Sequence, residues 1–265
     1  MTASTADLER PAPVLRIASY NIRKCVGLDW RRRPDRVIDV LGELGADIVA
    51  IQEADRRFGV RTPTLPTEPL RDQAGLAPVP TPPSSPSSGH HGNAILIGKD
   101  AEVVATTPLD LPSLEPRGAM IADIAVRGVA LTVVAVHLGL RASDRLRQAE
   151  AILAEIAKDR DPRRTVILGD MNAWSASSKA MAALAADYQP NTPLKTFHSA
   201  MPMAPLDRIF LGRDFLFGRT FVHRSAVADI ASDHLPVCAD ITLNGGRQTE
   251  DAPTVAEEGA PSTTR

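Results

Sequence analysis

Residues 165–172 read TVILGDMN and are the most informative eight residues of the chain. The run TVIL is apolar and rich in β-branched residues, which is typical of a strand covered on both faces. The run stops at Asp170, and a second polar residue, Asn172, follows two positions later. A strand that is buried along its length and then ends in an acid and an amide predicts a sheet edge that carries chemistry.

Short apolar runs of the same kind recur along the chain, bounded by Gly, Pro, Asp or Asn, a pattern that predicts strands. Because the runs are apolar throughout, both of their faces need cover, either from helices or from a second sheet. The runs occupy residues 14–22, 46–54, 93–98, 120–126, 129–138, 164–170, 207–212 and 236–243.

Three segments predict helices. Pro34 precedes apolar residues spaced i, i+3, i+4 and i+7, and this stripe ends at Gly45, so both the start and the stop of a packed helix are marked. Ser143 with Asp144 is expected to cap a second, amphipathic helix. Residues 177–186 suggest a third helix.

Composition predicts one domain between two tails. Residues 1–13 and 245–265 are polar and lack periodicity, so we expect them to be disordered. Residues 14–244 form the domain, which can bury a sizeable core because 43% of the chain is hydrophobic. The Pro/Ser-rich stretch at residues 78–89 is expected to be a mobile loop that does not pair in a sheet.

Charge and cysteine content restrict the class of protein. The chain has 30 basic and 32 acidic residues, and the domain without its tails has 27 and 26, so no global field attracts nucleic acid or an anionic membrane. The first 13 residues are polar and include Asp7 and Glu9, so we expect no secretory signal, and no apolar run approaches the roughly 20 residues of a membrane span. Cys25 and Cys238 lack metal-ligand spacing, which favours a reducing cytoplasm over a disulfide framework.

Polar residues fall repeatedly at the ends of the apolar runs. Strand ends converge on one edge of a layered sheet fold, so we expect these residues to share a pocket. The alternative is that each residue caps a strand or starts a turn; it is the stronger interpretation for Asn21 or Asp170 taken alone, but not for the whole set. The set comprises Asn21, Glu53, His137, Asp170, Asn172, Asp233 and His234.

Six blocks, in this order, resemble those of the endonuclease/exonuclease/phosphatase superfamily, which includes DNase I, AP endonucleases, neutral sphingomyelinases and inositol polyphosphate 5-phosphatases. The resemblance implies an α/β fold, a DNase I-like four-layer sandwich of two mixed β-sheets flanked by helices. It also implies hydrolysis of a phosphate ester with Mg²⁺ or Mn²⁺ as cofactor. The blocks are SYNIR, VAIQEAD, VAVHLG, LGDMNAW, LDRIFL and SDHLPV, and they span residues 16 to 242.

The resemblance implies roles for the metal and water ligands. Glu53 and Asn21 resemble the site of a hard cation, which takes oxygen ligands and keeps some of its own waters. Asp233 resembles a second metal ligand or an orienting residue, although a carboxylate there could equally cap the loop. Asp170 resembles the residue that orients or deprotonates the attacking water, and Asn172 resembles a donor to the phosphate.

Two histidines complete the implied catalytic set. Asp207 and His234 resemble a coupled pair in which the carboxylate keeps the imidazole protonated, so that it can donate to a phosphate oxygen. The alternative for Asp207 is a turn residue before the apolar run that follows it. His137 matches the histidine that faces the phosphate in DNase I and the sphingomyelinases, and its alternative is a buried histidine bonded to the backbone.

Three further residues are candidates for binding the substrate phosphate. Arg23 stands where AP endonucleases have an acidic residue, which argues against AP endonuclease activity and adds a cation to the edge of the site. Asn93 resembles a phosphate ligand of related family members, and Arg117 is a further candidate. The arginines at 31–33 fit an anionic substrate or a solvated loop equally well.

We expect a phosphodiesterase acting on a small or lipid-borne phosphodiester, with transient membrane-lipid contact and no obligate protein partner. A DNA or RNA nuclease is the less favoured alternative, because aromatic residues make up only 4% of the chain and no basic stripe is evident. An inactive scaffold that binds a phosphorylated partner is the alternative from another class. It is disfavoured because all of the implied site residues are present.

Overall fold

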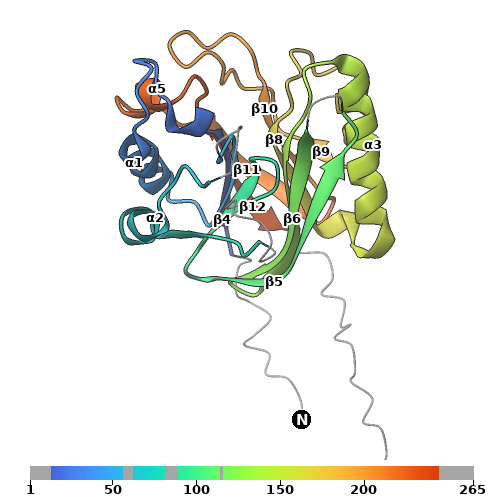
Figure 1. The fold of residues 1–265 in the computed structure, drawn as a ribbon. Helices are drawn as coiled ribbons and strands as arrows, with labels where there is room; N and C mark the ends of the chain where they lie inside the picture. Colours follow the sequence, from blue (N-terminus) through green and yellow to red (C-terminus); the bar gives the residue numbers. More distant parts are fainter. Residues whose placement is uncertain (1–12, 56–61, 82–88, 114–115, 245–265) are drawn as a thin grey trace, which may run out of the picture.

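The computed structural model describes residues 13–55, 62–81, 89–113 and 116–244 of the 265-residue chain. Residues 1–12 and 245–265, which hold nearly all of the two predicted tails, lie outside the described residues. Two six-stranded mixed sheets pack against each other, with helices on their outer faces (Figure 1). This arrangement confirms the predicted four-layer α/β sandwich.

The first sheet has the strand order β11-β12-β1-β2-β4-β3. Strands β1 (Leu15–Asn21) and β2 (Ile48–Gln52) are parallel, and helix α1 (Pro34–Leu44) connects them. The remaining pairs in this sheet are antiparallel. Its other strands are β3 (Leu76–Pro78), β4 (Ala94–Gly98), β11 (Phe215–Val222) and β12 (Val237–Leu243).

The second sheet has the order β5-β6-β7-β8-β10-β9 and repeats this plan. Strands β7 (Val129–His137) and β8 (Thr165–Asp170) are parallel, and helix α3 (Ala142–Asp159) connects them. Each sheet therefore contains one β-α-β unit, whose two strands end at the same edge. The other strands are β5 (Ala101–Leu111), β6 (Arg117–Val126), β9 (Gln189–Pro190) and β10 (Asp207–Leu211).

Three apolar clusters hold the four layers together. The inner cluster joins the facing sides of the two sheets, for example Ile17 of β1 and Met120 of β6. A second cluster packs α1, α2 (Thr67–Ala74) and α5 (Ala228–Ala231) on the outer face of the first sheet. A third packs α3 and α4 (Lys179–Ala185) on the second sheet, and α3 covers that side in Figure 1. No helix in the described ranges is long and apolar enough to cross a bilayer.

The helix predictions are confirmed in position but not in every detail. Helix α1 begins at Pro34 and ends before Gly45, which adopts the left-handed conformation (φ 54°) that glycine tolerates best. The predicted third helix is α4, and α2 was not predicted. The capping prediction for α3 is wrong. Its N-cap is Arg141, and Ser143 and Asp144 lie within the first turn, where the Asp144 carboxylate accepts a hydrogen bond from Arg147.

All eight predicted strands are present, and the predicted loop at 78–89 needs correction. Pro78 is the last residue of β3 and pairs with Leu96 of β4, and Val79 N–H donates to Ile95 O. Proline is tolerated there because β3 lies at the edge of the sheet, where a missing N–H breaks no ladder. Residues 82–88 lie outside the described residues.

The strand register brings the predicted polar residues to one edge of the sandwich. Asn21 at the end of β1 pairs with Gln52 at the end of β2, directly before Glu53. In the second sheet Asp170 lies between His137 on β7 and Asp207 on β10. The paired strand ends of the two sheets therefore bring these polar residues to one edge, as the sequence led us to expect.

Gly169, the residue before Asp170, marks a close approach of two backbones. A Cβ atom at this position would lie 1.9 Å from the carbonyl oxygen of Val136 on the neighbouring strand. No real Cβ atom can be that close to backbone, so β7 and β8 would have to separate. The glycine of the GD pair is therefore required by the packing that positions Asp170.

We expect Gly169→Ala to lower the free energy of unfolding by about 1–3 kcal/mol, the usual cost of overpacking. The matched control is Gly42→Ala in α1, where the new Cβ would lie 3.4 Å from the nearest atom, Gln73 O, and alanine favours the helix. Urea unfolding of the two variants provides the measurement. Equal stability of the two variants would contradict this account of Gly169.

Candidate active site

Asp170 is the centre of the candidate site and is almost completely buried at the end of β8. Its Oδ2 accepts a hydrogen bond from Asn21 Nδ2 at 3.0 Å, which reaches it from the other sheet. Its Oδ1 accepts one from the backbone N–H of Asn172 at 2.9 Å. Two donors from different elements therefore fix the orientation of the carboxylate.

Two buried histidines face the same carboxylate oxygen but differ in charge. His137 Nε2 lies 3.4 Å, and His234 Nε2 lies 3.7 Å, from Asp170 Oδ2. Burial, helped by Arg117 and opposed by Asp170, lowers the pKa of His137 to about 4. Burial would also lower the pKa of His234, but the Asp207 and Asp170 carboxylates outweigh it and raise the pKa to about 10. Near neutral pH His137 is thus neutral and His234 is a cation.

Asp207 holds His234 in this position. His234 Nδ1 lies 2.8 Å from Asp207 Oδ2, and the hydroxyl of Thr196 donates to the same oxygen at 2.6 Å. The ring of Phe197 packs against the imidazole, with 5.0 Å between the centroids. The predicted Asp207–His234 pair is therefore brought together, with its Nε2 edge directed at Asp170.

Glu53 and Asn21 lie at the ends of neighbouring parallel strands. Glu53 follows β2 in the left-handed conformation (φ 56°), and the ammonium of Lys24 forms an ion pair with its Oε2. Burial would raise the pKa of Glu53, but the neighbouring His137, Lys24 and His234 side chains together lower it. Asn21 uses Oδ1 to accept the backbone N–H of Arg23 at 3.1 Å.

The donor chemistry of this corner fits a hard divalent cation. Glu53 and Asn21 offer only carboxylate and amide oxygens, which Mg²⁺ prefers.

A second candidate for the metal position is the cluster around Asp207. Within the described residues, the buried Oδ1 of Asp207 has no hydrogen-bond partner. Asp170, Asp207 and His234 also have ligand atoms within 4.8 Å of one another. A protonated His234 between two carboxylates has no lone pair to offer, so Glu53 is the better anchor for a metal.

Asp233 and Arg23 pair at the mouth of the site. Arg23 Nε lies 3.4 Å from Asp233 Oδ2, and the guanidinium lies over the exposed ring of Trp30, 4.4 Å from its centroid. The predicted metal ligand Asp233 thus engages an arginine, and its role with a metal stays a prediction. Arg23 therefore contacts Asp233 on one side and Trp30 on the other, at the edge of the site where the sequence predicted a phosphate ligand.

The other predicted phosphate ligands are placed less directly. Asn172 Nδ2 donates to Leu138 O at 2.8 Å, which leaves one amide hydrogen for a substrate. Asn93 is buried and its Nδ2 points at the carbonyl oxygens of Gly118 and His90, at 2.8 and 3.4 Å. A phosphate contact would require that amide to move. Arg117 begins β6 and is close enough to affect the charge state of His137.

Three supporting residues were not identified from the sequence. Thr196 lies in a loop without a motif, so no local pattern indicated its bond to Asp207. Ser232 precedes Asp233 and its hydroxyl donates to the carbonyl of Asn21 at 2.7 Å, tying the last block to the end of β1. Arg208 follows Asp207 and is fully buried, with Nη2 3.3 Å from Ala173 O. A charged residue inside an otherwise apolar strand was the sequence feature that could have identified Arg208 as a supporting residue.

Comparisons with known proteins identify the family of the chain. The family model for the Endonuclease/Exonuclease/phosphatase family matches residues 18–234. The uncharacterized protein YbhP of Escherichia coli strain K12 is 31% identical over 164 residues, which cover 58% of this chain and 64% of YbhP.

Solved structures share the fold at low identity. A conserved protein of unknown function from Enterococcus faecalis V583 has a TM-score of 0.71 and 19% identity, covering 87% of this chain and 100% of its own. An endonuclease/exonuclease/phosphatase from Bacteroides vulgatus has a TM-score of 0.69 and 20% identity, covering 88% and 100%. These likenesses show the fold, and the family model covers most of the chain. The chain belongs to the Endonuclease/Exonuclease/phosphatase family, whose members are hydrolases.

Proposed function

We propose that the chain is a divalent-cation-dependent phosphodiesterase that acts on a small or lipid-borne phosphodiester. The observation that carries this proposal is the position of Asp170 between a neutral and a protonated imidazole, His137 and His234. A carboxylate base beside a fixed cationic donor is the pair that hydrolysis of an anionic ester requires.

In this mechanism each side chain has one task. The carboxylate of Asp170 orients a water molecule and takes its proton as the water oxygen attacks phosphorus. The P–O bond to the ester group breaks in the same displacement, and the leaving oxygen takes up a proton from solvent. His234 donates from Nε2 to a phosphoryl oxygen, and the remaining amide hydrogen of Asn172 donates to another. Neutral His137, whose Nε2 lies 3.4 Å from Asp170 Oδ2, contacts the phosphate beside this carboxylate. Mg²⁺ or Mn²⁺, held by Glu53 and Asn21, would neutralise charge on the phosphoryl and leaving oxygens.

A group of exposed apolar side chains supports a lipid-borne substrate. Leu140 follows His137 by three residues, Trp174 follows Asn172 by two, and Trp30 contacts Arg23. Single exposed apolar residues are common, but several on the loops of one site indicate a docking surface. The exposed fractions are 77% for Trp30, 68% for Leu140, 65% for Trp174, 65% for Met201, 57% for Met203 and 43% for Ile230.

Backbone contacts connect the loops on the Asp233 side of the site. Leu28 N–H donates to Ile230 O at 3.0 Å, and Ser199 N–H donates to Asp233 O at 2.8 Å. Exposed arginines at positions 31–33 lie on the loop that contains Leu28 and Trp30, and exposed Arg141 follows Leu140 on the loop after β7. Apolar side chains interspersed with arginines suit the boundary between phosphate headgroups and acyl chains.

Nucleic acid is the weaker candidate substrate. A protein that tracks a duplex neutralises several phosphates along a basic face, whereas this domain has nearly equal numbers of basic and acidic residues. Both cysteines, Cys25 and Cys238, are buried and free, which is compatible with the cytoplasmic location that we propose.

Metal removal tests the cation requirement. We expect EDTA to abolish hydrolysis of bis-p-nitrophenyl phosphate, and Mg²⁺ or Mn²⁺ to restore it, because Glu53 and Asn21 offer hard oxygen ligands. Glu53→Gln should raise the Mg²⁺ concentration needed for half-maximal rate. Full activity in metal-free protein would refute the proposal.

Two substitutions test the roles around Asp170. Asp170→Asn and His234→Asn should each lower turnover by about 10²-fold or more, since general-base and electrostatic terms are typically worth that much. The control is His223→Asn, which removes a comparable 2.8 Å contact between an imidazole and a carboxylate, that of Glu43, outside the site. A variant with near-normal turnover would remove that residue from the mechanism.

A surface double variant tests the substrate class. Replacing Leu140 and Trp174 by Ser should lower turnover on phospholipid vesicles by about 10²-fold or more and leave turnover on bis-p-nitrophenyl phosphate unchanged, because each buried apolar side chain contributes about 1.5–3 kcal/mol to membrane association. The matched control is Val104→Ser, an equally exposed apolar residue (71%) on β5. Equal loss on both substrates, or efficient nicking of plasmid DNA with no lipid turnover, would overturn the lipid assignment.

A further inference from the structure

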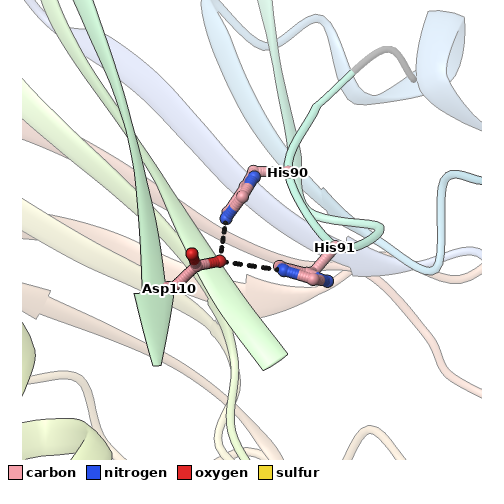
Figure 2. Close-up of side chains that lie close together, drawn as sticks. All are labelled: His90, His91 and Asp110. Atoms are coloured by element: carbon pink, nitrogen blue, oxygen red, sulfur yellow. Dashed lines mark hydrogen bonds and ion pairs between the residues drawn. The ribbon is translucent and has the colours of Figure 1, made fainter. Parts of the chain in front are cut away.

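A second group of ligating side chains lies outside the Asp170 centre. His90 and His91 project from the turn before β4, and Asp110 projects from β5 (Figure 2). His90 Nε2 and His91 Nε2 lie 2.9 and 3.0 Å from the same carboxylate oxygen, Oδ1 of Asp110. The two rings meet edge to face, with 4.4 Å between their centroids and 72° between their planes.

The backbone of the turn directs the two successive side chains of His90 and His91 towards the same carboxylate oxygen. His90 and Asn93 exchange backbone hydrogen bonds of 2.8 and 2.9 Å, and the two residues between them have positive φ, 49° for His91 and 83° for Gly92. This is the pattern of a type I′ turn, in which a histidine at the first central position is unusual because of its left-handed backbone. This turn conformation places the ring of His91 beside that of His90.

The facing strand leaves space for both rings. Gly118 on β6 pairs with Asp110 on β5. A Cβ atom at Gly118 would lie 2.5 Å from His90 Cδ2 and 2.8 Å from His91 Cδ2. The imidazoles therefore rest directly on a glycine, next to the carboxylate that they share.

We propose that His90, His91 and Asp110 form a binding site for a zinc-class divalent cation. Their ligand atoms all lie within 4.8 Å of one another. Tetrahedral zinc with ligand bonds of about 2.0–2.1 Å separates its ligands by roughly 3.3 Å, and the two nitrogen–oxygen distances of 2.9 and 3.0 Å are close to this separation. Two imidazole nitrogens with one carboxylate select zinc over Mg²⁺, in contrast to the oxygen ligands of Glu53 and Asn21.

The site is accessible and its carboxylate is charged. The side chains of His90 and His91 are 24% and 22% exposed, and that of Asp110 is 84% exposed. Hydrogen bonds from the two imidazoles lower the pKa of Asp110. Three protein ligands at an exposed position leave a fourth for water or for an oxygen of a ligand.

The turn also contacts the residue that we assign to the hydrolytic metal. Ala54 N–H donates to Gly92 O at 2.9 Å, and a Cβ at Gly92 would lie 3.5 Å from Glu53 Cα. An ion bound by the histidines ties this turn to the β5–β6 pair. The second site is therefore next to the first but shares no ligand with it.

Zinc titration in excess Mg²⁺, which occupies the oxygen site, tests the proposal. Wild-type protein should bind one Zn²⁺ by calorimetry, and Co²⁺ in its place should give the intense visible absorption of a tetrahedral complex. His91→Gln and Asp110→Asn should each weaken Zn²⁺ binding by at least about tenfold. The matched control, His223→Gln, removes another partly exposed imidazole–carboxylate pair and should bind Zn²⁺ as the wild type does.

Folding is checked independently of the metal. Asp110 is mostly exposed, so Asp110→Asn should unfold in urea with EDTA at the same midpoint as the wild type. Unchanged Zn²⁺ affinity in both site variants, or displacement of Zn²⁺ by Mg²⁺ alone, would overturn the proposal and leave the three residues as a hydrogen-bonded cluster.

Discussion

The buried hydrogen bond from Asn21 to Asp170 joins the two sheets at their active edge. Asn21 ends β1 in one sheet and Asp170 ends β8 in the other, and their side chains meet at 3.0 Å. A buried carboxylate needs such donors, because leaving it without them costs more than an ordinary hydrogen bond contributes. The relative position of the sheets therefore determines where Asp170 lies, and every other site residue is placed with respect to it.

Much of this arrangement follows from local sequence pattern, and the rest does not. The run at 165–170 and the glycine at 45 predicted β8 and the end of α1 because burial and backbone conformation leave local traces. Strand β5 was missed because it is a mostly exposed edge strand without a continuous apolar run. The contacts of Thr196 and Ser232 depend on loops that only the tertiary fold brings together, and the shared carboxylate of His90 and His91 depends on strand register.

The site contains two histidines in opposite protonation states. His137 and His234 are both buried and both face Asp170, and His234 also contacts a second carboxylate, that of Asp207, through its other ring nitrogen. Burial disfavours the charged form of each, and the second carboxylate outweighs burial for His234 alone. The fold thus places a neutral and a cationic imidazole around one carboxylate, beside the oxygen ligands of Glu53 and Asn21.

The most direct test of this account is the protonation state of the two histidines at neutral pH, measured from the ring ¹⁵N chemical shifts of metal-free protein. The pKa values of about 4 for His137 and about 10 for His234 predict one neutral and one doubly protonated ring. Asp170→Asn and Asp207→Asn variants would assign the signals by shifting them. Two neutral rings, or two rings that titrate together near the ordinary value of about 6.5, would contradict the account.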